Sequence, residues 1–343
     1  MKKMNKLIVA TLSLAFLTTG GVVYGAEKAK DEGWDVPNIA LGNGLTPAEQ
    51  EQTKEILMKD ASNVPALKGT DMTKNNIFIV DGDDLVKYVT DVPEFTSSSK
   101  AYSSAFITRT KKDSGVTVDI VTPQNITSRT EAMYCSAAIT SGVYDAYIRI
   151  ASVRTMDGSG ALAGIYKIYD EVDPAANAEV QQERDEKREV AQEQMQVVSA
   201  IDNENQGKDN YSSENILVML ADIQLELQKI NEKLANMSKE EVGTEVEKVV
   251  DEQIEKNGLT ESITPELRGQ VVNNMINFTQ TQGINDKEMT EQLSHFKDDI
   301  VKNGKEFKDS LLSDENVEKA KKGLSGFWQA VKEFFTNLFS KSN

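Results

Sequence analysis

The sequence predicts an α+β/α/β fold: a small sheet with covering helices, followed by an all-α C-terminal region. Strand-like runs and capped helices alternate up to Val172, and beyond that residue only helical periodicity remains. The charge changes at the same point, since residues 26–171 carry a formal net charge of −6 and residues 172–343 carry −14. We expect four parts: a leader at 1–25, an α/β domain at 26–172, a helical region at 173–322 and an amphipathic helix at 323–343.

The first 25 residues have the pattern of a secretory signal peptide. Three lysines at positions 2, 3 and 6 precede an apolar run at 7–17, which is shorter than a membrane span. Small residues follow, and cleavage is expected after Gly25. We therefore predict a secreted or envelope-associated protein, with retention as an uncleaved N-terminal anchor as the alternative.

The net charge and the cysteine count exclude one class of partner and one kind of cross-link. Without the leader the chain keeps 35 basic and 55 acidic side chains, a formal net charge of −20. Such a surface repels phosphate backbones, so nucleic acid is not an expected partner. The single cysteine, Cys135, excludes an intramolecular disulfide.

The first elements have clear start signals. Thr46, Pro47 and Glu49 form the N-terminal signature of a helix that should run to about Lys59. A buried strand is expected at 77–80, and acidic residues then favour a helix that runs to about Thr90.

A hairpin is predicted next. Residues 102–110 and 116–122 read as strands, and the loop at 111–115 has the length and composition of a hairpin turn. Ser128 with Glu131 predicts a capping box for a helix that stops near Gly142.

The α/β domain should end with a strand at 145–155 and a helix at 160–171. The predicted order is therefore α, β, α, β, β, α, β, α.

The helical region should open with a charged helix at 174–201 and continue with a heptad helix at 213–237. Ser238 with Glu241, and then Thr264, start further helices, and Ser313 starts another near the end. These helices could form an irregular bundle or an extended arm, and the heptad seam could pair with a second copy of the chain. The seam consists of Ile216, Leu220, Ile223, Leu227, Ile230 and Leu234, with Met237 after it.

The end of the chain predicts a strongly amphipathic helix. Residues 319–343 carry five lysines against one glutamate, the reverse of the protein's overall sign. Aromatic and basic residues together suit a helix that lies on a membrane surface, whereas a closing helix packed on the bundle is the alternative. The apolar face holds Phe327, Trp328, Val331, Phe334, Phe335, Leu338 and Phe339.

Catalytic patterns are weak. Ser97 and Lys100 spell an S-x-x-K motif, but its S-D-N and K-T-G companions are absent from the sequence. The only histidine, His295, falls in a charged helix, and Cys135 falls on an alanine-rich helix face, where it should behave as a small hydrophobe. We therefore expect no catalytic residues.

Cofactor and metal patterns also fail. Gly158–Ala163 matches G-x-G-x-x-A, but a charged helix follows where a dinucleotide fold needs another parallel strand. Asp81, Asp83 and Asp84 lack the register of a calcium loop and are expected to serve a helix N-terminus. We expect neither a cofactor nor a metal site.

Polar residues at strand ends are the remaining candidates for ligand binding. They are Ser104, Arg109, Gln124 and Asn125.

Several motifs resemble a family of uncharacterised secreted proteins of Gram-positive bacteria, the YpuA-like family (domain of unknown function 1002). They lie mainly in the α/β domain and read LGNGLTPAEQ from Leu41, GVTVDIVTPQNIT from Gly115, AAITSGV from Ala137 and GSGALAGIYK from Gly158. The resemblance implies an exported protein and supplies no catalytic residue.

The leading hypothesis is a non-enzymatic interaction protein of the cell envelope or extracellular space. Its α/β domain would bind a partner, and its last helix would dock on a membrane or a protein. The expected partner is an envelope protein, a polymer or a membrane surface. A hydrolase acting on envelope polymers, through Ser103, Ser104, Arg109 and the 124–125 turn, is the first alternative. A homo-oligomeric structural protein built on the heptad helix is the second.

Overall fold

A five-stranded mixed sheet forms the first part of the chain, in a computed structural model that describes residues 33–206, 208 and 211–311. The strand order is β2-β1-β3-β5-β4. β1 runs parallel to β2, β5 runs parallel to β4, and β3 is antiparallel to both β1 and β5. The strands are β1 (Asn38–Gly42), β2 (Asn76–Val80), β3 (Ser104–Arg109), β4 (Thr117–Ile120) and β5 (Ala146–Ala151).

Helices cover both faces of the sheet, because side chains alternate along each strand. On one face, Ile39 and Phe106 pack with Leu57 of α1 (Pro47–Met58). On the other, Ala40 packs so closely on α4 that a Cβ at Gly164 would lie 2.8 Å from it. The helices of that face are α2 (Gly82–Tyr88), α3 (Glu131–Thr140) and α4 (Ser159–Val172). Elsewhere along the chain, short 3-10 turns span Gly33–Asp35, Ala61–Asn63, Pro65–Leu67, Pro123–Asn125 and Gln282–Asn285.

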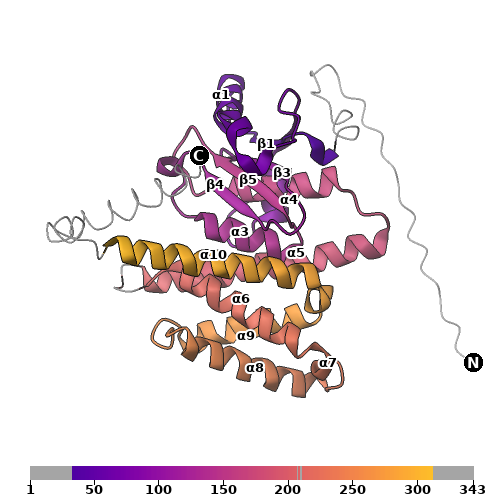
Figure 1. Ribbon diagram of the computed structural model, residues 1–343, viewed down its shortest axis with the longest axis vertical. Coiled ribbons are helices and arrows are strands. Elements are labelled where there is room, and N and C mark those ends of the chain that lie inside the picture. The colour runs from indigo at the N-terminus through magenta and orange to yellow at the C-terminus, as the bar shows by residue number, and fades with distance from the viewer. Residues whose placement is uncertain (1–32, 207, 209–210, 312–343) are drawn as a thin grey trace, which may run out of the picture.

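The helical region packs as a bundle beneath this layer rather than as an arm (Figure 1). α5 and α10 contact α3, α6 contacts α10 and α8, and α9 contacts α5 and α8. One continuous hydrophobic cluster runs from the sheet into these helices. The helices are α5 (Ala178–Asn205), α6 (Ser213–Lys229), α7 (Asn231–Leu234), α8 (Lys239–Lys256), α9 (Pro265–Thr279) and α10 (Lys287–Leu311).

The fold class is therefore confirmed, and so are most local start signals. Thr46 with Glu49 and Ser238 with Glu241 both form complete capping boxes, and Thr264 caps α9. Asp81 caps α2 with its own carboxylate, as the acidic run predicted.

The heptad seam finds its partners inside the chain. Ile216, Leu220, Ile223 and Leu227 have no exposed surface, and α6 packs against α3, α8 and α10. The helix is shorter than predicted, because it ends at Lys229 and Ile230 separates it from α7.

One strand escaped prediction. Asn38–Gly42 forms β1, which lies between β2 and β3 and is buried along its whole length. Its five residues include only two large apolar side chains, too few for a strand signal.

The predicted hairpin is wrong, since β5 lies between β3 and β4. The cause is Asp145, which immediately precedes β5. Its carboxylate accepts hydrogen bonds from the backbone N–H groups of Asp113, Ser114 and Gly115 at 2.9–3.0 Å, and its carbonyl accepts one from Thr110 N. The loop is thereby held across the start of β5 instead of reversing tightly. We call this set of contacts the Asp145 clamp.

The capping box predicted at Ser128 is also wrong. Thr130 caps α3, and the Glu131 carboxylate accepts a hydrogen bond from the N–H of Ile120 on the edge strand β4 at 2.9 Å. Burial, together with the negative charge of Asp119, raises the pKa of Glu131 to about 7, although the hydrogen bond from Ile120 N acts to lower it. Glu131 therefore covers a sheet edge rather than a helix end.

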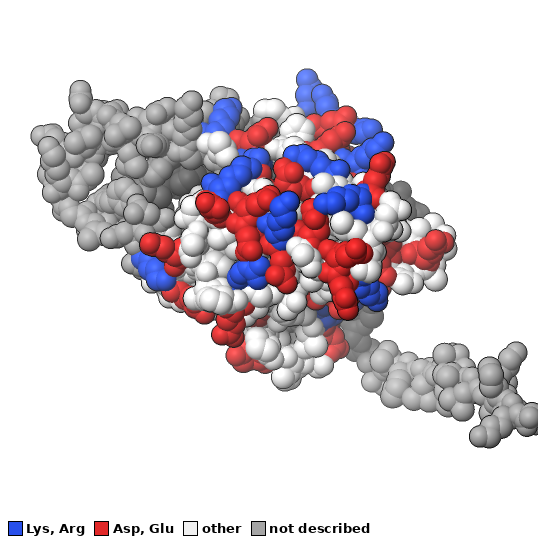
Figure 2. Space-filling model, turned by 90° about the horizontal axis from the view of Figure 1, so that it is seen from below, with Lys and Arg blue, Asp and Glu red and all other residues white. Residues whose placement is uncertain are grey.

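Charge is interleaved on the surface that α8 and its neighbours present. Figure 2 shows acidic and basic side chains side by side over this face. Arg268 pairs with Glu247 and Asp251, and Lys233 pairs with Glu245. No helix in the described ranges is both long enough and apolar enough to span a membrane. The predicted leader, the Ser313 start signal and the terminal helix at 323–343 lie outside those ranges.

The Asp145 clamp yields a stability prediction. Asp145→Asn should lower the free energy of unfolding by roughly 1–3 kcal/mol, because the new amide N–H₂ would face the N–H of Asp113. Urea denaturation measures the loss. Asp113→Asn is the matched control, because this exposed aspartate also has positive φ and lies in the same loop. Equal stability of the two variants would contradict the clamp.

Candidate functional site

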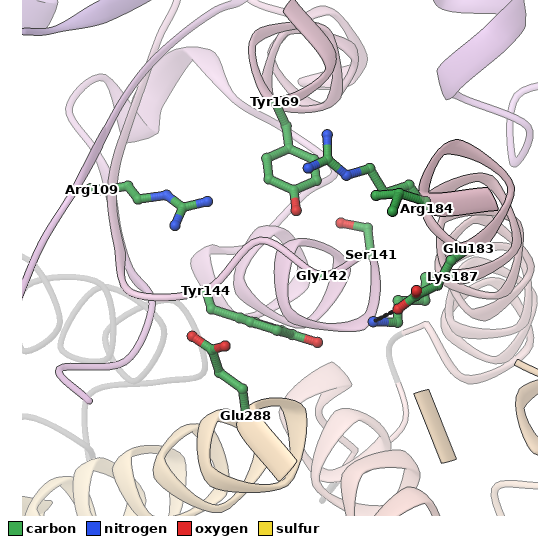
Figure 3. Close-up of a pocket in the computed structure, with 10 residues that line it drawn as sticks. Arg109, Ser141, Gly142, Tyr144, Tyr169, Glu183, Arg184, Lys187 and Glu288 are labelled. Atoms are coloured by element: carbon green, nitrogen blue, oxygen red, sulfur yellow. Dashed lines mark ion pairs between the residues drawn. The ribbon is translucent and has the colours of Figure 1, made fainter. Parts of the chain in front are cut away.

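A polar cleft of about 180 Å³ opens where the sheet meets the helical region (Figure 3). We call it the junction cleft. It brings together the end of β3, the end of α3, the last turns of α4 and the first turns of α5 and α10. Its principal side chains are Arg109, Tyr144, Tyr169, Glu183, Arg184, Lys187 and Glu288.

Local structure explains why these groups meet. Arg109 is the last residue of β3, and its guanidinium lies 5.2 Å from the ring centre of Trp34. Gly142 adopts φ +91°, which ends α3 and directs the chain toward Tyr144. Glu288 is in the first turn of α10.

Two of the cations in the cleft are already paired. Arg184 contacts the Asp173 carboxylate at 3.2 Å and stacks 4.8 Å above the ring of Tyr169. Lys187 contacts Glu183 at 3.0 Å and Asp286 at 2.7 Å.

Asp286 gathers several partners. It also accepts a hydrogen bond from the Tyr144 hydroxyl at 2.8 Å. Burial alone would raise the pKa of Asp286, but its hydrogen bonds, chiefly from Lys187, hold that pKa below its ordinary value. The same contacts hold the pKa of Lys187 above its ordinary value despite burial. This side of the cleft is therefore a fixed ionic wall.

Three other groups retain unused hydrogen-bonding capacity. Arg109 donates from Nη2 to Asp173 at 3.3 Å, and among the described residues its Nε and Nη1 have no partner. The Tyr169 hydroxyl and the Glu288 carboxylate likewise have none within that part of the chain. Figure 3 shows the Arg109 guanidinium and the Tyr169 hydroxyl directed into the open centre.

Of the four residues predicted for ligand binding, only Arg109 lines this cleft. Ser104 is at the other end of β3, fully buried, and its hydroxyl accepts a hydrogen bond from Gly42 N. Asn125 donates to Ser152 O at 2.7 Å near that end, and Gln124 beside it is exposed. The structure therefore places Arg109 apart from the other three.

Sequence reasoning missed the remaining cleft residues. Arg184 and Lys187 fall in a long charged helix, where a solvated face is the ordinary interpretation. Tyr169 and Glu288 belong to helices far apart in the chain, and no local motif links them.

The Gly158–Ala163 motif has a packing explanation. A Cβ at Gly158 would lie 2.2 Å from the Tyr134 hydroxyl, and one at Gly160 would lie 2.8 Å from Ser103 O. A second groove of about 300 Å³ lies beside this turn, lined by Phe95, Met156 and their neighbours.

The surroundings of Cys135 and His295 suit structural roles. Cys135 is buried and donates from Sγ to Val116 O at 3.3 Å, and burial raises the pKa of its thiol. His295 lies exposed on α10. Within the described ranges no three His, Cys, Asp or Glu side chains form a group that could hold a metal ion.

Comparison with known proteins confirms the resemblance drawn from the motifs. The family model described as "Protein of unknown function (DUF1002)" matches residues 41–296. The chain is similar to the uncharacterised protein YpuA of Bacillus subtilis (strain 168), with 26% identity over 335 residues, covering 97% of this chain and 92% of that protein. No solved structure matches the chain.

The ionic wall yields a prediction with a pH dependence. Lys187→Met should lower the free energy of unfolding at pH 7 by roughly 2–4 kcal/mol, because Asp286 is left half-buried without its cation. The folded-state pKa of Asp286 is depressed, so its stabilisation is present above the ordinary value of 3.8 and is lost as pH falls below it. The difference between Lys187→Met and the natural protein should therefore shrink in acid.

Urea denaturation at pH 7 and pH 3 measures this difference. Lys248→Met is the matched control, because Lys248 makes an exposed ion pair with Glu252 at 3.8 Å, worth under about 0.5 kcal/mol. If Lys187→Met lowers the free energy of unfolding no more than Lys248→Met does, the ion pair between Lys187 and Asp286 does not stabilise the fold.

Proposed function

The chain belongs to the DUF1002 family of proteins of unknown function, and from that premise we propose that it is an exported binding protein and not an enzyme. Its junction cleft captures a small polar ligand, and its helical region holds that cleft in shape.

One observation carries this proposal: Arg109, Tyr169 and Glu288 offer unused polar groups around one open cleft whose far wall is fixed. Polar groups that converge on a concave surface without satisfying one another are the usual mark of a ligand site. The cleft volume of about 180 Å³ is below the 300 Å³ or so of pockets that bind drug-sized compounds, which favours a smaller ligand.

The surroundings of the nucleophile candidates support binding rather than catalysis. Ser103 and Ser104 have no exposed surface, and their hydroxyls accept hydrogen bonds from the backbone N–H groups of Ala161 and Gly42. The thiol of Cys135 is held protonated by burial. Among the described residues, these groups have neither the hydrogen-bonded base nor the access that a nucleophile needs.

Export and docking rest on the sequence. The basic and apolar pattern of residues 1–25 supports secretion or attachment to the cell envelope. The aromatic face from Phe327 to Phe339, with its lysines, supports docking on a membrane surface, an envelope polymer or an envelope protein. Binding would then take place at the cell surface.

The binding function is tested by thermal unfolding of the full chain with a panel of small anions, cations, zwitterions and neutral polyols. At least one class should raise Tm, because a ligand at a hundredfold excess over Kd adds about 2.7 kcal/mol of stability. Arg109→Met should abolish the shift. If no class raises Tm, or if the shift persists in Arg109→Met, the cleft is not the binding site.

Docking is tested by flotation with anionic vesicles. The full chain should float, whereas a chain truncated after Gly323 should not. Serine at Phe327, Trp328, Phe334 and Phe335 should also abolish flotation, and serine at Gln329, Thr336 and Asn337, on the polar face, is the matched control. Equal flotation of all forms, or none, would remove membrane docking from the proposal.

A further inference from the structure

The charge balance of the junction cleft narrows the chemistry of its ligand. Arg184 and Lys187 are neutralised by Asp173, Glu183 and Asp286. Arg109 is the last residue of β3 and shares Asp173 with Arg184. Glu288, in the first turn of α10, makes no ion pair with the described residues.

Glu288 lies in surroundings that favour a cation beside it. Burial raises the pKa of its carboxyl, and the negative charges of Asp145 and Asp286 raise it further. The positive charges of Arg109 and Lys112 act in the opposite direction, so Arg109, although it also pairs with Asp173, lies within electrostatic reach of Glu288.

We infer that the junction cleft binds a small zwitterion of amino acid or dipeptide size, with its carboxylate on Arg109 and its ammonium on Glu288. This inference rests on the proposed binding function and names its ligand class. The guanidinium donates from Nη2 to Asp173, and its Nε–H and Nη1–H₂ groups remain available, so that it can donate charge-assisted hydrogen bonds to a ligand carboxylate. The Tyr169 hydroxyl is placed to hydrogen-bond the carboxylate or the peptide group of the ligand (Figure 3).

Ligands with one sign of charge fit less well. A simple anion would satisfy Arg109 but would add negative charge next to Glu288, where Asp286 and Asp145 already lie close. A simple cation would satisfy Glu288 and leave the guanidinium facing a like charge. A zwitterion satisfies both groups and leaves the net charge of the cleft unchanged.

The size and walls of the cleft agree with this class. Its volume of about 180 Å³ corresponds to roughly six water molecules, at about 30 Å³ each. The rings of Tyr144 and Tyr169 line it and offer apolar faces to the aliphatic part of an amino acid.

The test is isothermal titration calorimetry of the full chain at pH 7 with alanine and dialanine of either hand. Two capped probes accompany them: N-acetyl dialanine, which has only the negative charge, and dialanine amide, which has only the positive charge. At least one zwitterion should bind saturably, and each capped form of dialanine should bind at least tenfold more weakly than dialanine.

Variants assign the two charges. Arg109→Met should no longer distinguish dialanine from its amide, and Glu288→Gln should no longer distinguish dialanine from its N-acetyl form. Arg154→Met is the matched control for Arg109, because both side chains are 44% exposed, pair with a carboxylate and stack on an aromatic ring. Glu266→Gln, in the first turn of α9, is the control for Glu288. Both controls should bind like the natural protein.

Two results would overturn the inference. Equal or tighter binding of a singly charged probe, lost in Arg109→Met, would replace the zwitterion by an ion and leave the binding function intact. The absence of binding by every zwitterion would reject the ligand class, and the wider panel of the thermal experiment then decides whether the cleft binds anything.

Discussion

The Asp145 clamp is the contact on which the arrangement of this protein depends. One carboxylate holds three backbone N–H groups of the loop that follows β3, and it also accepts a hydrogen bond from Gln292 of α10 at 2.9 Å. The first set of bonds holds the chain across the start of β5, in the position that the strand order β3-β5-β4 requires. The bond to Gln292 docks the helical region against the sheet at the same point.

The junction cleft follows from that geometry. Arg109 comes just before the clamped loop, Gly142 and Tyr144 come just before Asp145, and Glu288 lies one helical turn before Gln292. Side chains from separate parts of the chain therefore surround one space because a single residue draws their backbones together. Lys187 and Asp286 then fix the remaining wall, so that Arg109, Tyr169 and Glu288 are presented on a rigid frame.

Local chemistry made part of this architecture predictable. At Thr46, Ser238 and Thr264 the helix begins because the N-cap side chain accepts a hydrogen bond from the backbone N–H three residues later. The heptad seam can be recognised from the spacing of its apolar residues alone. The misleading case is Glu131, whose spacing from Ser128 suits a capping box but whose carboxylate is drawn to Ile120 N on β4. The Glu131 carboxylate accepts from a backbone N–H of the edge strand instead of from one at the helix N-terminus, and the local sequence gives no sign of this tertiary contact. Arg109 was found because polar residues at strand ends are noticeable, whereas Lys187 and Glu288 resemble any solvated helical charge until tertiary contacts place them.

If the junction cleft binds a ligand, Arg109 anchors that ligand in addition to pairing with Asp173. Arginine side-chain NMR tests it directly, since the Nε–H signal of Arg109 can be followed while alanine or dialanine is added. We expect a saturable shift of the Arg109 signal and none at Arg154. The two side chains are both 44% exposed, and Arg154 stacks on Tyr102 as Arg109 stacks on Trp34. An unmoved Arg109 signal, or equal shifts at both arginines, would contradict it.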